Sequence, residues 1–445
     1  MKKFEIQKEP VDRWIVDPMK RFISNSTTSG ILLFSSALLA MLLANSPWSN
    51  QFHHLWEIEF SIGFNGSFIT KSLHHWINDG LMAVFFFVVG LELKREIVAG
   101  ELRDVRKAML PIGAAIGGMI FPAAIYFMIN PSGEASEGWG IPMATDIAFA
   151  LGVLYLLGDK VPLSLKIFLT ALAITDDLGA VLVIAFCYTS SIDFVSLFTG
   201  GVFLLVLIIS NLLGVRNTLY YAVVGIGGLW LAFLMSGVHA TIAAVLAAFT
   251  IPIKVKVSEI QFGERLDYLL SKFKAEKPNN LPTVTNEQLH ILQEIRDVSK
   301  YALTPLQRLE HALHPLVSFV IMPVFALANA GITLSNDILS QFLSPVSLGV
   351  FFGLIAGKVV GVLLMVTLFL KLKWAVLPAG INKMHLIGVS FLAAIGFTMS
   401  LFIVGLAFTN EAYILQAKLG ILVASLTASI IGFFIIKKAS AKTHE

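Results

Sequence analysis

Charged side chains are scarce in this sequence. Asp, Glu, Lys and Arg make up only 14% of its 445 residues, whereas a soluble domain usually carries roughly 25%. The deficit excludes an ordinary soluble domain, because most of the chain cannot face water. The net charge is only +3, which does not indicate nucleic acid as a partner.

Cysteine is almost absent as well. The single cysteine, Cys187, excludes an intrachain disulfide, and its position inside an apolar run favours a small buried side chain over a reactive thiol. We also do not expect a cleaved signal peptide. The segment before the first apolar run contains Glu5, Asp12 and Asp17, which a signal peptide would not carry.

Apolar residues, in contrast, make up 56% of the chain, and its mean hydropathy is +0.79. Apolar runs of about 20 residues, the length that crosses a bilayer as a helix, recur from Gly30 to Ile436. We therefore predict an all-α polytopic membrane protein with about twelve transmembrane helices. The predicted spans are residues 28–45, 75–93, 108–129, 140–158, 163–188, 194–213, 218–235, 237–253, 315–333, 346–370, 385–409 and 413–436.

The connecting segments alternate in charge. One set contains nearly all the basic residues outside the spans, and the other set is mostly acidic. The positive-inside rule places the basic set in the cytoplasm. Both termini are then cytoplasmic, which agrees with an even number of spans.

Two connecting segments are long enough to have structure of their own. Residues 57–69 alternate apolar and polar side chains and contain Asn65-Gly66, a strong signal for a tight turn, so we predict an external β-hairpin. A lone hairpin is marginal in water, so it either lies on the protein surface or pairs with a second copy. In the polar cytoplasmic segment, residues 286–301 have helical apolar spacing, which suggests a short amphipathic helix. We favour a solvated regulatory or filler insertion as the role of the segment. The chain is accordingly divided into residues 1–253, 254–308 and 309–445.

Four ionisable residues lie inside predicted spans, where a charge is costly and by default marks a function. They are Asp146, Asp176, Asp177 and Lys358. A structural ion pair is the alternative for Lys358, and a helix-end position is the alternative for Asp146. A purely structural role suits Asp176 and Asp177 poorly, because adjacent like charges repel in a low dielectric and add nothing to packing.

The Asp176–Asp177 pair has the chemistry of a site that exchanges a cation for protons. Burial and mutual repulsion favour protonation of such carboxylates, and the two titrate as a coupled pair. Ionised carboxylates are also the ligands that small hard cations prefer. One site can therefore hold either a cation or protons. A nearby Lys358 would favour the ionised carboxylates and disfavour a bound cation.

The fourth and eleventh spans contain helix-breaking residues. Pro142 comes just before Thr145-Asp146, and Gly396 lies near the middle of the eleventh span. Interrupted helices at corresponding positions of two halves are the best sequence indication of a transporter binding site. There Asp146 could neutralise N-terminal helix ends, and Lys358 could neutralise C-terminal ones.

A second group of ionisable residues is predicted at the cytoplasmic edge, at the end of the second span and the start of the ninth. Histidines beside carboxylates titrate in the physiological range, so this group could respond to pH, and ordinary interfacial charge is the alternative. The group consists of Glu92, Arg95, Glu96, Glu310, His311 and His314. His239 is expected near the external face, where a satisfied structural histidine is equally compatible with the sequence.

At these residues the sequence strongly resembles the NhaA family of sodium/proton antiporters. The matching stretches, among them Thr-Asp-Asp-Leu-Gly-Ala at 175–180, come in family order and cover nearly the whole chain. Any one of them is a weak signal, but together they are specific. They are residues 76–86, 90–96, 144–152, 175–180, 236–241, 308–315, 325–331 and 395–400.

The resemblance implies two inverted repeats whose discontinuous helices, spans 4 and 11, cross within the membrane. It implies that Asp176 and Asp177 bind Na⁺ or Li⁺ and the exchanged protons, with Asp177 the more direct cation ligand. Lys358 would pair with Asp176 in one state. The residues that support the crossing would be Thr145, Asp146, Lys358 and Gly396.

The resemblance also implies the physiology. The protein would export Na⁺ in exchange for external protons by alternating access, electrogenically and under pH control through the cytoplasmic group. Asp79 would be a membrane-embedded acid of lesser role. The protein would lie in the bacterial inner membrane, dimerise through the hairpin at 57–69, and need no cofactor besides the transported ions. The segment 258–300 is longer than we expect for the family.

Three other functions are less compatible with these residues. A sodium-coupled symporter of a small organic anion would share the broken-helix fold, but no spare intramembrane arginine is present to bind the anion. An intramembrane aspartyl protease needs two carboxylates from separate segments and a Gly-x-Gly-Asp motif, which the sequence lacks. An ion channel is disfavoured by Lys358 and by the lack of a carbonyl-lined filter motif. We therefore expect a transporter and not an enzyme.

Overall fold

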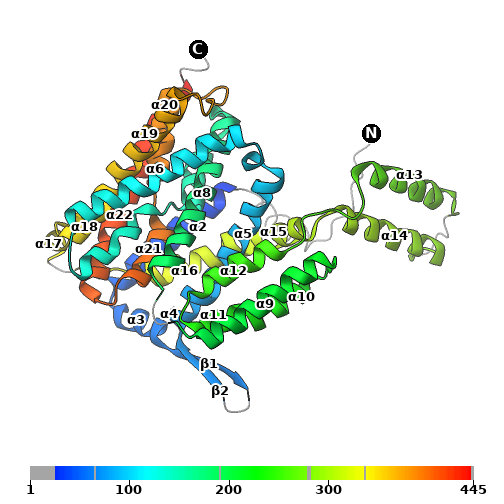
Figure 1. Cartoon of the computed structure of the whole chain (residues 1–445), viewed down its shortest axis with the longest axis horizontal. Coiled ribbons are helices and arrows are strands. Elements are labelled where there is room, and N and C mark those ends of the chain that lie inside the picture. The colour runs from blue at the N-terminus through cyan, green and yellow to red at the C-terminus, as the bar shows by residue number, and fades with distance from the viewer. Residues whose placement is uncertain (1–25, 65–66, 190–191, 278–281, 335–336, 442–445) are drawn as a thin grey trace.

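The structure, a computed structural model, describes residues 26–64, 67–189, 192–277, 282–334 and 337–441. Most of these residues form helices that lie side by side in one elongated bundle (Figure 1). A β-hairpin lies at one end of the bundle, which we call the hairpin end. The other end, where the last helix finishes, is the opposite end.

The helices of the first half alternate in direction between these two ends; η denotes a 3₁₀ or π helix. They are α2 (Ser26–Ala44), α3 (Ser49–Glu57), α4 (Leu73–His75), η2 (Trp76–Leu81), α5 (Met82–Ala99), η3 (Glu101–Arg103), α6 (Val105–Ile129), η4 (Glu134–Met143), α7 (Ile147–Tyr155), η5 (Gly158–Lys160), α8 (Leu163–Cys187), α9 (Phe194–Leu212), α10 (Thr218–Val224), η6 (Gly225–Trp230), α11 (Leu231–Ser236) and α12 (Ala240–Thr250).

The second half begins with two helices outside the bundle and then returns to it. Its elements are α13 (Glu259–Ala275), α14 (Asn286–Ala302), α15 (Pro305–Leu316), η7 (Val317–Ile321), α16 (Met322–Asn329), α17 (Ile338–Phe342), α18 (Pro345–Phe352), η8 (Gly353–Gly357), α19 (Lys358–Lys371), α20 (Lys383–Ala393), α21 (Phe397–Ala407) and α22 (Glu411–Ala441).

The membrane helices pack in two groups. In the first group, which we call the crossing bundle, α6 packs on α8 and α19, α22 packs on α18 and α20, and α21 packs on η4. In the second group, the outer bundle, α5 packs on α12, α2 packs on α16, and α9 packs on α11. The two bundles meet along a seam where α2 contacts α7, α5 contacts α8 and α16 contacts α21.

Helix length and composition confirm a polytopic membrane protein. Within the described residues, nine helices are long and apolar enough to cross a membrane, and the pair α20–α21, bent by 41°, makes a tenth. The two remaining predicted spans are also present as helices. One is η2–α5, which ends in charged residues, and the other is α12, which covers Ala240–Thr250 instead of 237–253. At that length α12 is too short to cross the hydrocarbon alone.

Both predicted helix interruptions are confirmed. The fourth span consists of the 3₁₀ helix η4, an extended stretch at Ala144–Asp146, and α7. The eleventh span breaks between α20 and α21, at Ala394–Gly396. The prediction of one helix over 140–158 is wrong for its first part, because that part winds as a 3₁₀ helix.

The predicted β-hairpin is confirmed and is slightly longer than expected. Strands β1 (Glu59–Phe64) and β2 (Ser67–Ser72) pair antiparallel, from Glu59 opposite Ser72 to Phe64 opposite Ser67. The predicted turn pair Asn65-Gly66 lies outside the described residues. The chain continues from β2 directly into α4, so the hairpin is joined to the start of the second span.

The segment after α12 forms a helical hairpin that projects away from the bundle (Figure 1). The predicted helix over 286–301 is confirmed as α14, and α13 was not predicted. Ser258 and Thr285 begin the two helices with capping boxes, and Leu269 and Ile291 are buried between them.

The ninth span begins at the opposite end with α15, at Pro305 and not near residue 315. Thr304 caps this helix through Gln307, and Pro305 occupies its first turn, where its missing N–H costs nothing.

Candidate functional site

Hydrogen bonds hold the two helix breaks against each other, and Asp146 makes most of them. One of its carboxylate oxygens accepts from the Phe149 backbone N–H at 2.9 Å and thereby caps α7. The other accepts from the Thr398 backbone N–H at 3.1 Å and from the Thr398 hydroxyl. The Asp146 backbone N–H donates to the Ile395 carbonyl at 2.6 Å. The carboxylate therefore lies at the N-terminal ends of both α7 and α21.

Two hydroxyl groups complete the crossing. Thr145 Oγ1 donates to the Ala393 carbonyl at 2.7 Å, and Ser400 Oγ donates to the Ile141 carbonyl at 2.7 Å. Each bond runs from one broken span to the other and satisfies a carbonyl that the break leaves free. Gly396, predicted as a supporting residue, is the N-cap residue of α21.

Lys358 and Asp176 form a buried ion pair beside this crossing. Lys358 Nζ lies 2.6 Å from Asp176 Oδ2, and each side chain is only 1% exposed. Lys358 Nζ also donates to the carbonyl of Met143, the last residue of η4. The lysine is placed by the π helix η8, which ends at Gly357 immediately before it. π-helical turns are often found at functional sites.

Asp177 is completely buried and has no hydrogen-bond partner. Neither of its carboxylate oxygens, nor Oδ1 of Asp176, accepts a hydrogen bond within the described part of the protein. Asp176, Asp146, Glu92 and Lys358 all act on Asp177 electrostatically. An unpaired buried carboxylate is costly, so the pair has three oxygens suited to holding protons or a cation.

A cavity of about 710 Å³ opens at the opposite end of the bundle and leads toward this pair. Its lining comes from the end of α5, from η3, and from the starts of α6 and α8. The lining residue farthest along α8 is Ala171. Asp176 lies five residues beyond it, on the order of 7–8 Å along the helix axis. The cavity therefore stops short of the buried carboxylates.

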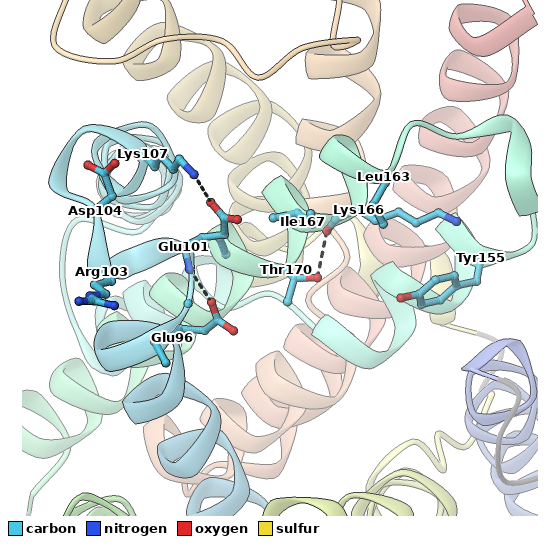
Figure 2. Close-up of a pocket in the computed structure, with 13 residues that line it drawn as sticks. Glu96, Glu101, Arg103, Asp104, Lys107, Tyr155, Leu163, Lys166, Ile167 and Thr170 are labelled. Carbon is cyan, nitrogen blue, oxygen red and sulfur yellow. Dashed lines mark hydrogen bonds and ion pairs between the residues drawn. The ribbon is translucent and has the colours of Figure 1, made fainter. Parts of the chain in front are cut away.

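Charged side chains of both signs line the cavity (Figure 2). Lys107 Nζ lies 3.9 Å from a Glu101 carboxylate oxygen, and the Glu101 backbone N–H donates to Glu96 at 3.0 Å. On the other side, Lys166 extends toward Tyr155, with its Nζ 5.2 Å from the ring centroid. The mouth of the cavity is therefore bordered by groups that can attract ions of either sign.

The predicted cytoplasmic group is partly assembled. Arg95 pairs with Glu310 of α15 and donates to Glu96 at 3.0 Å, so it joins the end of α5 to the start of α15. Glu310 is only 9% exposed. Glu92 acts electrostatically on Glu310, on Arg95 and also on Asp177. The group is thus linked by charge to the buried pair.

The other predicted residues lie outside the buried site, although His311 and His314 are close enough to interact electrostatically with Glu310 and Arg95. His311 and His314 lie on the exposed side of α15, and His311 acts on Glu310 only electrostatically. His239 lies at the start of α12 with Nε2 2.8 Å from the Tyr188 carbonyl oxygen. Asp79, expected to be embedded in the membrane, pairs with His75 at 2.7 Å and is 22% exposed.

Two hydrogen-bonding side chains, Thr398 at the crossing and Lys94 at the end of α12, are not predicted from the sequence. Thr398 lies within a stretch that carries the family resemblance, but its hydroxyl was not assigned to Asp146. Lys94 Nζ donates at 2.6 Å to each of the Phe249 and Ile251 carbonyls and so caps the end of α12. Its only sequence signal is a basic residue near the end of a span.

Comparison with known proteins matches almost the whole chain. A family model described as Na⁺/H⁺ antiporter 1 covers residues 20–436. The Na⁺/H⁺ antiporter NhaA of Oleidesulfovibrio alaskensis is 49% identical over 430 residues, which cover 96% of this chain and 95% of the relative. The Na⁺/H⁺ antiporter NhaA 1 of Saccharophagus degradans is 46% identical over 441 residues, which cover 97% and 95%.

The share of each chain that is aligned tests whether the segment that includes α13 and α14 is unusually long. Because each alignment spans at least 95% of both chains, these relatives have nearly the same length as this one. They therefore do not support the expectation that the segment 258–300 is unusually long.

Proposed function

Because this chain belongs to the NhaA family of Na⁺/H⁺ antiporters, we propose that it exchanges Na⁺ for H⁺ across the bacterial inner membrane. The observation that carries the proposal is the unpaired, fully buried carboxylate of Asp177 beside Asp176. A charge at this depth needs a counter-charge or a proton. Na⁺ and H⁺ would compete for the same oxygens, and such competition is the basis of exchange.

In this proposal Asp177 contributes both of its carboxylate oxygens to Na⁺, and Asp176 contributes one. No cluster of three or more His, Cys, Asp or Glu side chains is found in the described ranges. We therefore expect carbonyl, hydroxyl and water oxygens to complete the coordination of Na⁺. Asp176 can use its other oxygen only after Lys358 moves away, because the ion pair occupies it. Release of Lys358 would thus accompany Na⁺ binding.

We propose that access to the site alternates between the two sides of the membrane. Positive charge in the connecting segments supports a cytoplasmic location for the cavity and an external location for the hairpin end. The described conformation would then open inward, toward Na⁺ that is to be exported. Alternation would come from movement of the crossing bundle against the outer bundle along their seam. Two carboxylates can carry two protons against one Na⁺, so we expect the exchange to be electrogenic.

We further propose that two copies pair through their β-hairpins. Among the described residues no further strand pairs with the outer edges of this two-stranded sheet, and such edges can add strands from another copy. A two-stranded hairpin is marginally stable alone, so pairing would also stabilise it.

The alternative of a sodium-coupled symporter for an organic anion is not favoured. Both relatives described above are named as Na⁺/H⁺ antiporters, and an anion would need a cationic partner at the site. Lys358 is the positively charged side chain at this site, and its charge is already neutralised by Asp176.

The exchange is tested by proton flux in everted membrane vesicles that contain the full-length protein. Na⁺, Li⁺ and K⁺ would each be added over a series of pH values. We expect Na⁺ to release protons from acidified vesicles, with Li⁺ similar and K⁺ ineffective. If none of the three cations moved protons at any pH, the proposed function would be wrong.

Control by pH is proposed for the group of Glu92, Arg95, Glu96 and Glu310. Replacing Glu310 with alanine removes the partner of Arg95 across two helices, so the guanidinium then acts alone on Glu92 and Glu96. We expect Glu310→Ala to shift the pH profile of Na⁺-driven proton flux without removing transport.

The matched control for Glu310→Ala is Glu294→Ala. Glu294 also pairs with an arginine, Arg265, but this pair lies between α13 and α14, away from the bundle. Its loss should leave the profile unchanged. An unshifted profile in Glu310→Ala would contradict the assignment of the sensor.

A further inference from the structure

A buried histidine closes the cap at the start of α20, at the opposite end of the bundle (Figure 1). The His385 backbone N–H donates to Asn382 Oδ1 at 2.9 Å, and the Asn382 backbone N–H donates to His385 Nδ1 at 3.3 Å. These reciprocal bonds form a capping box. His385 is 0% exposed, so water does not reach the ring in the described conformation.

The same ring reaches the end of α22. Because Nδ1 accepts the Asn382 N–H, it cannot carry a proton, and a neutral His385 must carry its proton on Nε2. Nε2 lies 3.2 Å from Ser440 Oγ, which is buried in the last turn of α22, and therefore donates to that hydroxyl. One side chain thus joins the first turn of α20 to the last turn of α22.

Histidine is unusual at this position in this chain. Three other helices in the described ranges begin with a capping box, and each has glutamine where α20 has histidine. Glutamine makes both bonds of the box but cannot titrate. Of these four boxes, only the one at α20 can be broken by a proton. The glutamines are Gln261 of α13, Gln288 of α14 and Gln307 of α15.

The surroundings of His385 do not accommodate an imidazolium. The helices α22, α19, α7 and α8 pack on α20, and their turns at the opposite end have no carboxylate. No charged group in the described part of the chain acts on the ring. A protonated Nδ1 would face the Asn382 N–H without an acceptor, and a positive charge in the first turn opposes the helix dipole. Protonation should therefore expel the ring from its buried position. The titratable residues in those turns are Tyr155, Lys166, Lys371, Lys383, Lys437 and Lys438.

We propose that His385, Asn382 and Ser440 form an acid-sensitive clasp, which fastens α20 to the end of α22 and opens when the cytoplasm acidifies. The link to transport rests on the proposed exchange and orientation. The last residue of α20, Ala393, accepts the hydrogen bond of Thr145 at the crossing. With the clasp open, α20 would be held less firmly, and the exchange of Na⁺ for H⁺ would slow.

The clasp is tested by hydrogen–deuterium exchange of the full-length protein in lipid nanodiscs. If only the open state takes up the proton, with an ordinary histidine pKa of about 6.5, the open population rises about tenfold from pH of about 8 to about 5.5. After correction for the intrinsic pH dependence of exchange, the Asn382, His385 and Leu386 N–H groups should lose about that much protection. The box of Gln288 in the same protein is the reference and should not respond.

Three substitutions separate the clasp from a general effect of acid. His385→Gln restores the residue of the other boxes, so protection at pH of about 8 should remain and the acid response should disappear. His290→Gln, which removes an exposed histidine of α14, should leave the response unchanged. Ser440→Ala removes the acceptor of Nε2–H, so exchange in the last turn of α22 should rise about fivefold at both pH values.

The clasp is overturned if the wild type responds to acid no more than the reference box, or if His385→Gln keeps the response. Unchanged exchange in Ser440→Ala would overturn the fastening of α20 to α22. The wild-type result decides the question even when a variant does not fold.

The effect on transport is measured separately, in everted vesicles whose outer solution bathes the cytoplasmic face. His385→Gln should keep a larger fraction of its Na⁺-driven proton flux at pH of about 6 than the wild type does, and equal fractions would contradict the link to transport. Hydrogen exchange needs no transport. A protein that moved no Na⁺ would therefore refute the proposed exchange, while the exchange of the α20 N–H groups would still decide the clasp.

Discussion

Replacing Asp177 with asparagine should abolish Na⁺-driven proton movement. The substitution keeps the shape of the side chain but removes both the charge that attracts Na⁺ and the group that accepts the proton. Asp176 alone should not suffice, because Lys358 neutralises its charge in the described conformation, and Asp146 is engaged by α7 and Thr398. Everted vesicles that contain Asp177→Asn should give the proton flux of vesicles without the protein.

The matched control for this variant is Asp193→Asn. Asp193 is an exposed residue that caps α9 through the Val195 and Ser196 N–H groups. Hydrogen bonds from Ser196 hold the pKa of this carboxyl below its usual value, so Asp193 is ionised in the transport assay. We propose the same charged state for Asp177 when it binds Na⁺. Asparagine caps helices as well as aspartate does, and transport should remain. Full activity in Asp177→Asn would refute the assigned site.

Replacing Lys358 with methionine should destabilise the protein by about 3–5 kcal/mol, the usual cost of leaving one member of a buried ion pair without its partner. Asp176 would remain ionised at 1% exposure with no cation beside it, unless it took up a proton. The Met143 carbonyl would lose its donor as well. Denaturant titration of the purified proteins in detergent would measure the difference in the free energy of unfolding between Lys358→Met and the wild type.

The double variant Lys358→Met/Asp176→Asn distinguishes charge from packing. It removes both charges of the pair, and replacing a buried pair by uncharged groups is often nearly neutral. Most of the lost stability should therefore return. If Lys358→Met alone were as stable as the wild type, or if the double variant were no better than the single one, the ion pair would not stabilise this bundle.

Most of the helices could be predicted because lipid imposes a simple rule. A chain in hydrocarbon must satisfy its own backbone hydrogen bonds, so a long apolar run becomes a helix of about the same length. Residues 163–188 and 194–213 are predicted as spans and observed as Leu163–Cys187 and Phe194–Leu212. The charged residues within such runs could be found for the same reason, since each one departs from the rule.

The conformation of η4 could not be predicted, because it depends on distant side chains. Tyr126 of α6 donates to the Ala135 carbonyl at 2.7 Å, and Tyr188 donates to the Glu137 carbonyl at 2.7 Å. These bonds occupy carbonyls that an α-helix would use internally. A local pattern of Gly and Pro indicates that the helix is interrupted, but not which other helices hold the interrupted part.

The hydrogen bond from Thr398 to Asp146 also could not be predicted from the residues around either one. Threonine hydroxyls within apolar helices commonly bond a carbonyl four residues earlier, as Thr170 and Thr175 do here. Nothing in its own neighbourhood distinguishes Thr398 from these two. Its role appears only when the two breaks are placed together, and that placement depends on the whole fold.

The crossing of the broken helices has a consequence for how the protein is made. The partners of Asp146 on α21 lie 252 residues further along the chain. At a synthesis rate of roughly 5–20 residues per second, they leave the ribosome some 10–50 s after Asp146 does. Throughout that interval the Asp146 carboxylate can cap α7 locally but lacks its two hydrogen bonds from Thr398. The first half of the protein therefore cannot complete the crossing until the second half has been inserted.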